Sequence, residues 1–278
     1  MTTQLHSGLE HTRGGKIRTA AKSKSNTAIR LLLISLVVIT AAALLTFDYK
    51  NIDLGKALAD TLHNIRTVFL SPKLVHDSFG EVLESLLVTF CLGALATILG
   101  MVLAFFAALL CASNIANPKT AALIKGIVAL VRAVPTVLWV LIFAVSAGLG
   151  SVAAVVGLTF HSFAYLTKVY AESIEEIDKG TIEALKASGA SFWQIVMQAI
   201  IPSCLSSLIA WTFMRFEINF TNAVAMGAAA GAGGVGFNLF MAGSFYFNLH
   251  EMGMLTYVVV IAVVILEMVS TRIKEKAK

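Results

Sequence analysis

Charge is scarce in this chain. Only 13% of its 278 residues are Asp, Glu, Lys or Arg, whereas a soluble domain usually carries about a quarter. Hydrophobic residues make up 58% instead, so the composition argues against a soluble enzyme and indicates one polytopic membrane domain. The net charge of +5 is therefore interpreted through its distribution along the chain and not as a nucleic-acid-binding surface.

Motifs for chemistry are also missing. The three cysteines lie in or beside apolar runs, lack metal-ligand spacing, and are interpreted as small buried hydrophobes. The sequence has no G-x-x-x-x-G-K-[ST] loop for ATP phosphates, and its six histidines form no zinc motif. No serine or cysteine triad stands out. We therefore expect no catalytic residue, no metal site and no cofactor on this chain.

Long apolar runs are what the chain does contain. A membrane-crossing helix needs about 20 mostly apolar residues. Runs of about this length cover residues 29–47, 85–112, 122–147, 151–168, 203–226 and 253–270. The first run is longer than the apolar core of a signal peptide and lacks a small-residue cleavage site, so we interpret it as a retained anchor. The sequence thus predicts an all-α integral membrane protein with six transmembrane helices.

These runs divide the chain into a predicted series of segments. They are a basic leader (1–28), a first anchor (29–47), a polar extracytoplasmic segment (48–81), the main transmembrane domain (82–272) and a short tail (273–278). Within the polar segment, Leu58, Leu62, Ile65 and Phe69 recur at helical spacing. This pattern predicts an amphipathic helix over residues 54–69, lying on the membrane surface or against the bundle.

Basic residues are distributed unevenly between the two sides of the membrane. With the N-terminus inside, the outer segments carry only Lys50, Lys56, Arg66 and Lys73, and most other Lys and Arg residues fall on the inner side. The positive-inside rule therefore predicts a multi-pass protein of the cytoplasmic membrane with both termini in the cytoplasm. It also puts the polar segment 171–202 on the cytoplasmic side, where ATP is available.

This cytoplasmic segment has a distinctive spacing. Glu183, Ala184, Gly189 and Pro202 fall in register with the pattern EAA-x3-G-x9-I-x-L-P. Three other positions keep apolar character with a different residue, namely Leu185, Ala199 and Ile201. The segment resembles the EAA loop of ABC-importer permeases. In that family the loop docks in a groove on the ATPase, so the resemblance assigns the contact to Glu183, Ala184 and Gly189.

Local signals predict two short helices around a turn in this segment. Gly189 suits the left-handed position that closes many helices, because it has no β-carbon. Ser191 and Gln194 have the spacing of a capping box that opens the second helix. Pro202 suits the first turn of the next span, where its missing N–H costs little. On local physics alone, an ordinary amphipathic connector between two spans is the alternative.

Polar residues inside the predicted spans are candidate functional groups, because charge in the bilayer is costly. They are Arg132, His161, Arg215, Glu217 and Asn219. Basic residues that line a pore suit anions, whereas interhelical ion pairs that fix the bundle are the alternative, with Arg132 and Glu217 as one possible pair. Arg215 and Glu217 are two residues apart and do not face each other on a helix.

A glycine-rich run over residues 231–236 matches G-x-G-x-x-G. That motif binds dinucleotides only between a strand and a helix of a βαβ unit, and here it follows an apolar span. We interpret the run as backbone that bends or packs closely.

Several stretches outside the EAA loop resemble phosphonate-transport permeases. They are residues 132–135, 161–172, 215–219 and 231–236, and the resemblance covers residues 82–272. It implies a type I ABC-importer fold with a cytoplasmic coupling helix. It also implies a second copy of the chain, two ABC ATPase subunits that bind ATP and Mg²⁺, an extracellular substrate-binding protein and the lipid bilayer as partners, without nucleic acid.

The implied function is that of the pore subunit of an importer working by alternating access, which is not an enzyme by itself. Phosphonates lead as the substrate class, with phosphite, phosphate esters or a different small solute as alternatives. An ion-coupled secondary transporter should show internal repeats, and no clear repeat is present. A membrane-embedded enzyme would need a set of catalytic residues, and none stands out. A membrane scaffold would not need charges inside its spans, so the intramembrane charges favour a transport pathway.

Overall fold

The computed structural model describes residues 24–46 and 53–276, and this part of the chain consists of helices and loops without a strand. The chain divides into two compact units, Met1–Ala59 and Asp60–Lys278. The first unit contains α1 (Lys24–Thr46), and α2 (Leu54–Leu70) crosses the boundary. The amphipathic helix predicted over residues 54–69 is thus confirmed as a helix. Most of the predicted basic leader lies outside the described residues.

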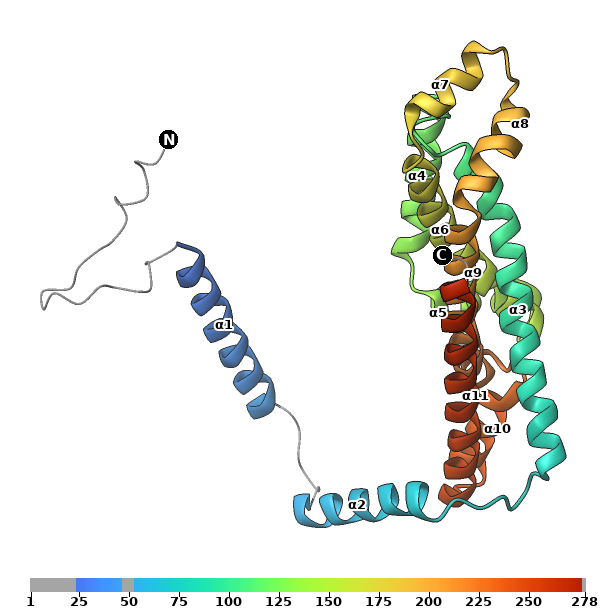
Figure 1. Ribbon diagram of the computed structural model, residues 1–278. Coiled ribbons are helices and arrows are strands. Elements are labelled where there is room, and N and C mark those ends of the chain that lie inside the picture. Colours follow the sequence, from blue (N-terminus) through green and yellow to red (C-terminus); the bar gives the residue numbers. More distant parts are fainter. Residues whose placement is uncertain (1–23, 47–52, 277–278) are drawn as a thin grey trace, which may run out of the picture. The chain divides into compact units, whose positions relative to one another are not determined.

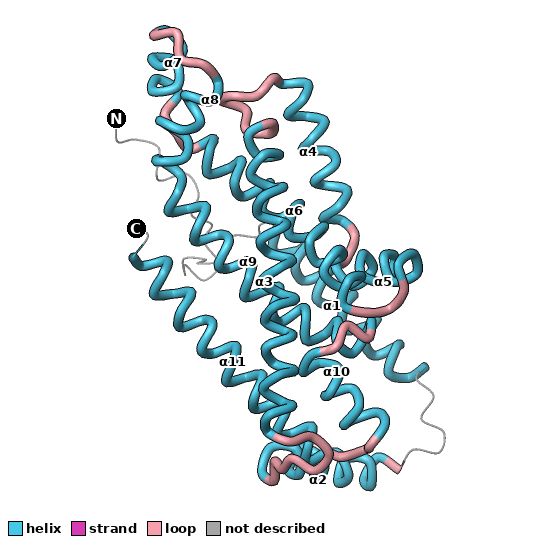
Figure 2. The backbone as a smooth tube through the Cα atoms, turned by 90° about the vertical axis from the view of Figure 1, so that its right-hand side faces the viewer, coloured by secondary structure: helices cyan, strands magenta, loops and turns pink. Residues whose placement is uncertain are grey.

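The second unit carries the remaining helices. They are α3 (Phe79–Leu109), α4 (Pro118–Ala133), α5 (Thr136–Ala147), α6 (Ser151–Glu175), α7 (Lys179–Ala187), α8 (Phe192–Ile195), the π-helix η1 (Val196–Ile200), α9 (Ile201–Ala230), α10 (Gly234–Phe240), the π-helix η2 (Met241–Phe245) and α11 (Leu249–Lys276). Figures 1 and 2 both place α7 and α8 at one end of the bundle and α10 toward the opposite end.

Five helical stretches are long and apolar enough to cross a membrane: Thr27–Thr46, Phe79–Leu109, Ser151–Glu175, Phe192–Ala230 and Leu249–Ile273. A sixth span exists if α4 and α5 are counted together. The two helices are bent by 88°, so the apolar run predicted over residues 122–147 is not one continuous helix. The cause is Pro135, which keeps Val134 in an extended conformation with ψ 124°, so that α4 ends at Ala133.

Small residues bring the central helices of the second unit together. A β-carbon on Gly100 of α3 would lie 2.6 Å from the Cβ of Ser162 on α6, so the α3 and α6 backbones approach closely at this point. Such contacts between small residues are the main means by which helices associate in a membrane, where no hydrophobic effect drives them together. The approach also brings polar side chains of α3 and α6 within reach of α9.

The glycine-rich run forms a tight connection between α9 and α10. α9 ends at Ala230 and is capped by Gly231 in a left-handed conformation, and a β-carbon on Gly236 would lie 1.7 Å from the carbonyl oxygen of Val224. The expectation of bending, closely packed backbone is confirmed.

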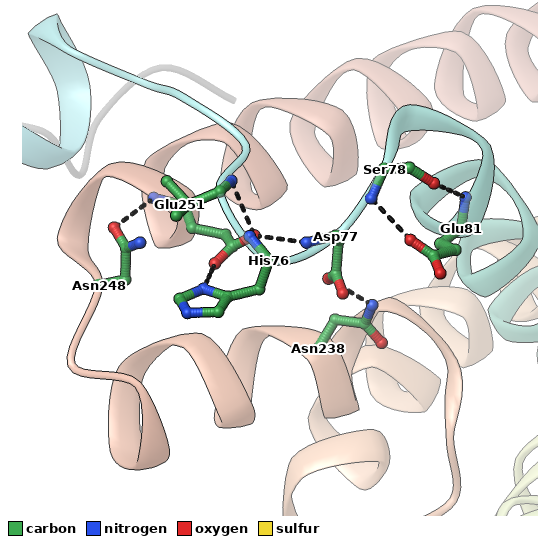
Figure 3. A network of polar contacts seen from close by, with 8 residues as sticks. His76, Asp77, Ser78, Glu81, Asn238, Asn248 and Glu251 are labelled. Carbon is green, nitrogen blue, oxygen red and sulfur yellow. Dashed lines mark hydrogen bonds and ion pairs between the residues drawn. The ribbon is translucent and has the colours of Figure 1, made fainter.

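A polar network (Figure 3) fixes the segment between α2 and α3, which lies at the end of the bundle opposite α7 (Figure 1). The Glu251 carboxylate of α11 is 1% exposed and accepts hydrogen bonds from the backbone N–H groups of Val75, His76 and Asp77, at 3.2, 2.8 and 2.9 Å. It also contacts Nδ1 of His76 at 2.7 Å. Asn238 of α10 donates from Nδ2 to Oδ2 of Asp77 at 2.7 Å. This network joins α11 and α10 to the start of α3.

Candidate functional site

The first candidate site is the projecting element formed by α7, the following turn and α8. Asp178 caps α7 by accepting the backbone N–H of Thr181 at 3.1 Å. Ile182 is 1% exposed and belongs to a hydrophobic cluster with residues from α3, α6 and α8, including Tyr170 and Ile195. The opposite face of α7 carries Glu183 and Ala184, both exposed. α7 is therefore anchored to the bundle on one side and open to a partner on the other.

The turn after α7 follows the sequence prediction closely. Gly189 has φ +83°, and no atom lies within 4 Å of the position that its β-carbon would take, so glycine is required by conformation and not by space. Ser191 and Gln194 form the predicted capping box, with Ser191 N–H donating to Oε1 of Gln194 at 2.7 Å. The predicted first short helix, the turn and the capping box are confirmed.

Pro202 lies in the first turn of α9, as predicted. The second short helix, however, does not end before the span. Instead α8, η1 and α9 form one continuous 39-residue helical stretch, Phe192–Ala230. Proline normally interrupts a helix because it has no N–H to donate. Here a π-helical turn precedes Pro202, in which the Ile201 N–H donates to the carbonyl of Val196, five residues back. The helix therefore continues through Pro202.

Two exposed aromatic residues, Phe192 and Trp193, lie directly after the turn, with 42% and 56% of their surface accessible. The sequence analysis used them only as part of a capping signal. Together with Glu183 and Ala184 they widen the accessible surface around the turn.

The start of the projecting element is tied to the α3–α4 connection. Glu175, the last residue of α6, accepts the backbone N–H of Ser113 at 2.7 Å and pairs with Lys125 of α4 at 3.0 Å. Asn114 donates from Nδ2 to the carbonyl of Ile174 at 2.8 Å. A displacement of α7 would therefore be transmitted to α4 as well as to α6. Sequence analysis did not single out Glu175 or Lys125, since neither belongs to a local motif.

The second candidate site is a polar cluster inside the bundle, formed by Thr97 of α3, Ser162 of α6, and Arg215 and Asn219 of α9. Arg215 donates from Nε to Oγ of Ser162 at 3.0 Å. Asn219 donates from Nδ2 to the same oxygen at 2.7 Å and to Oγ1 of Thr97 at 2.8 Å. The Ser162 and Thr97 hydroxyls donate in turn to the carbonyls of their own helices. We call these four residues the interior polar cluster.

Arg215 is buried, and no carboxylate among the described residues pairs with it. It is 2% exposed, and its guanidinium lies 5.4 Å from the centre of the Tyr165 ring. Within the described residues, its Nη2 and the Oδ1 of Asn219 have no hydrogen-bond partner. A buried cation is costly unless it is paired, so the Nη2 of Arg215 has the capacity to donate to an anionic group, whereas the Oδ1 of Asn219 is itself an acceptor.

The other predicted intramembrane residues are distributed around this cluster. His161 is half-buried, its Nδ1 has no partner among the described residues, and it lies within electrostatic range of both Arg215 and Arg132. Arg132 is exposed and lines a cavity between α4 and α6. No ion pair between described residues joins Arg132 to Glu217, so the suggested pairing is not formed. Glu217 is half-buried, away from Arg215 on the helix.

Comparison with known proteins identifies the domain that carries both sites. A family model described as "Binding-protein-dependent transport system inner membrane component" matches residues 96–275. Among curated relatives, the phosphate-import permease protein PhnE of Mycolicibacterium smegmatis is 32% identical over 153 residues, 55% of this chain and 29% of that protein. The phosphite transport system permease protein PtxC of Stutzerimonas stutzeri is 32% identical over 146 residues, 52% of each chain. This chain thus matches about half, or less, of the length of these relatives.

Solved structures with the same fold are also transporter subunits. A chain of the MetNI methionine ABC transporter in an inward-facing conformation aligns with a TM-score of 0.66 and 24% identity, covering 74% of this chain and all of that chain. A chain of a bacterial alginate ABC transporter aligns with a TM-score of 0.61 and 11% identity, covering 91% of this chain. At these identities the likeness concerns the fold.

Proposed function

We propose that this chain, which belongs to the binding-protein-dependent transport system inner membrane component family, is the permease subunit of an ABC importer for phosphonate-type anions. The fold is that of a type I importer permease, and the protein is a multi-pass membrane protein. Its proposed partners are a second copy of the chain, two ATPase subunits and an extracellular substrate-binding protein. ATP and Mg²⁺ would be bound by the ATPases and not by this chain.

The observation that carries the proposal is the architecture of α7. One face is anchored in the bundle through Ile182, and the other exposes Glu183 and Ala184 at the end of the molecule. A helix held in this way transmits force from a soluble partner to the spans, which is the task of a coupling helix. We place it in the cytoplasm together with both termini, on the basis of the excess of basic residues on that side.

Transport would follow from alternating access. Closure of the ATPases on ATP moves α7, and the contacts of Glu175 with Ser113 and Lys125 pass that movement to the start of α4. The α4–α5 pair, α6 and α9 would then open the path toward the outside. Hydrolysis resets the ATPases and returns the path to the inside.

The substrate class rests on two independent supports. The phosphate-import and phosphite permeases are among the relatives at 32% identity. Arg215 also supplies a buried cation whose Nη2 has no hydrogen-bond partner among the described residues. A phosphonate oxygen beside Arg215 would neutralise the positive charge of the guanidinium, which no carboxylate among the described residues neutralises.

A different small solute is the second candidate. A probable D-methionine transport permease MetI of Haemophilus influenzae is 26% identical over 197 residues, which is 68% of this chain. The amino acid also carries a carboxylate that Arg215 would bind. An ion-coupled secondary transporter is disfavoured by membership of the family.

Uptake of radiolabelled methylphosphonate by cells carrying the complete system tests the substrate class. We expect ATP-dependent uptake that unlabelled phosphite reduces and D-methionine does not. Good uptake of D-methionine without uptake of methylphosphonate would show that the permease serves another solute.

A further inference from the structure

The cavity beside Arg132 has a composition that the transport proposal does not yet use. It has a volume of about 280 Å³ and lies between α4 and α6, next to the end of α3. Five charged residues line it: Lys125, Arg132, Lys168, Glu172 and Glu175. The rest of its lining is apolar or weakly polar and includes Val128, Ala129 and Ala171. We call it the Arg132 cavity.

The charges of the Arg132 cavity do not cancel. Lys125 pairs with Glu175 at 3.0 Å, and Lys168 pairs with Glu172 at 3.5 Å. Both carboxylates are thus engaged with lysines. Arg132 has no carboxylate partner among the described residues, so the cavity keeps one uncompensated positive charge.

We propose that the Arg132 cavity is a second binding site for a phosphonate-type oxyanion, distinct from the interior polar cluster. The planar guanidinium of Arg132 suits two oxygens of such a group, and Lys125 and Lys168 add positive charge at the rim. The wall formed by Val128, Ala129 and Ala171 suits a small alkyl substituent. A bare inorganic anion would leave this wall without a contact, so an alkylphosphonate fits the lining better.

The position of the cavity separates it from the interior polar cluster. Ser162, which holds Arg215, and Lys168 are six residues apart on α6, about 9 Å along the helix axis. The cavity lies on the α7 side of the interior polar cluster, and His161 is within electrostatic range of both Arg215 and Arg132. Lys168 and Ala171 lie about 120° and 180° around α6 from Ser162, so the cavity faces another side of α6 and is separate from the interior polar cluster. This inference rests on the proposed function for the choice of ligand.

Protection of an introduced cysteine tests the site directly. Cys91 is exposed, contrary to its interpretation as a buried hydrophobe, while Cys111 and Cys204 are buried. Because Cys111 also lines the cavity, a Cys91→Ser, Cys111→Ala background allows selective labelling. Ala129→Cys places a thiol in the cavity lining, and Leu123→Cys places a matched thiol on the same helix at a residue that is 64% exposed and does not line the cavity. The full-length protein, purified with its co-purifying subunits, is treated with N-ethylmaleimide in methylphosphonate or in chloride of equal ionic strength.

We expect methylphosphonate to slow labelling of Ala129→Cys at least threefold and to leave Leu123→Cys unchanged. Arg132→Gln should raise the concentration needed for protection roughly ten- to hundredfold, as loss of a charged hydrogen bond does, whereas Arg132→Lys should weaken protection less. If Arg132→Gln fails to fold, Lys168→Gln replaces it, with the exposed Lys119→Gln as control. Protection should persist in Arg215→Met, which alters only the interior polar cluster.

Absence of protection, or equal protection in Arg132→Gln, would overturn the second site. If that result came with normal methylphosphonate uptake, the proposed transport function would stand without it. Protection without any methylphosphonate uptake would support the second site and contradict the proposed substrate class.

Discussion

Arg215 and Ser162 join α9 to α6 through a hydrogen bond of 3.0 Å from the guanidinium Nε to the hydroxyl Oγ. The same oxygen accepts from Asn219, and its own hydrogen goes to the carbonyl of Leu158. Ser162 therefore orients Arg215 but supplies no negative charge. The hydrogen bond therefore leaves the charge of Arg215 unneutralised, as the proposed binding of an anion requires.

Replacing Arg215 by Met tests whether the charge serves a ligand. Because the charge is buried and no described carboxylate pairs with it, its removal should leave the free energy of unfolding unchanged or raise it by up to roughly 4 kcal/mol. Uptake of methylphosphonate should be lost. Thermal unfolding in detergent and uptake in cells measure the two effects, with Arg66→Met on the exposed face of α2 as control. If Arg215→Met both lowered the unfolding temperature and abolished uptake, the loss of uptake would be explained by a structural role of Arg215.

Replacing Ser162 by Ala should remove the acceptor shared by Arg215 and Asn219. We expect a loss of about 1–3 kcal/mol in the free energy of unfolding, because two buried donors lose their partner, and weaker uptake. Ser146→Ala is the matched control, since the exposed Ser146 donates to the carbonyl four residues back in the same way. It should change stability by less than about 0.5 kcal/mol. Equal effects of the two changes, measured by thermal unfolding, would remove the special role of Ser162.

Local patterns predicted much of the fold. The apolar runs, the amphipathic helix α2, the Gly189 turn and the Ser191 capping box all follow from signals within a few residues. The bend between α4 and α5 and the π-turn before Pro202 were less predictable. Val134 before Pro135 is extended and α4 ends at Ala133, whereas Pro202 follows a π-turn and lies inside a continuous helical stretch. The presence of proline alone does not predict which of the two occurs.

The candidate sites were predicted only in part, because their partners are far apart in the sequence. Arg215 was a candidate from its position in an apolar run, but Ser162 and Thr97 are ordinary small polar residues whose role appears only when α3, α6 and α9 meet. Glu251 was missed for the same reason, since its partners are more than 170 residues away.

Replacing Gly189 by Ala tests the conformational requirement of the turn after α7. The residue has φ +83° with free space around it, so Ala should cost roughly 1–2 kcal/mol through backbone strain alone. Gly126→Ala on α4 also meets free space but has no positive φ, and should gain about 0.5–1 kcal/mol. Thermal unfolding of both variants measures the difference. A gain in stability for Gly189→Ala would contradict the strained turn.

Replacing Glu251 by Ala tests the network between α11 and the segment before α3. Three backbone N–H groups and His76 lose their acceptor, so we expect a loss of roughly 3–5 kcal/mol in the free energy of unfolding. Glu267→Ala removes an exposed carboxylate from the same helix and should change stability little. Equal unfolding temperatures for the two variants would show that the network contributes little.

The most direct test of the coupling role is co-purification of the full-length protein with its ATPase from native membranes. Glu183→Lys reverses a charge on the exposed face of α7, and Glu176→Lys makes the same reversal at an exposed residue just after α6. We predict that Glu176→Lys retains the ATPase, and that Glu183→Lys loses it while the permease keeps its unfolding temperature. Full retention of the ATPase by Glu183→Lys, and by a Gly189→Trp variant that still folds, would contradict the assignment of α7 as the coupling helix.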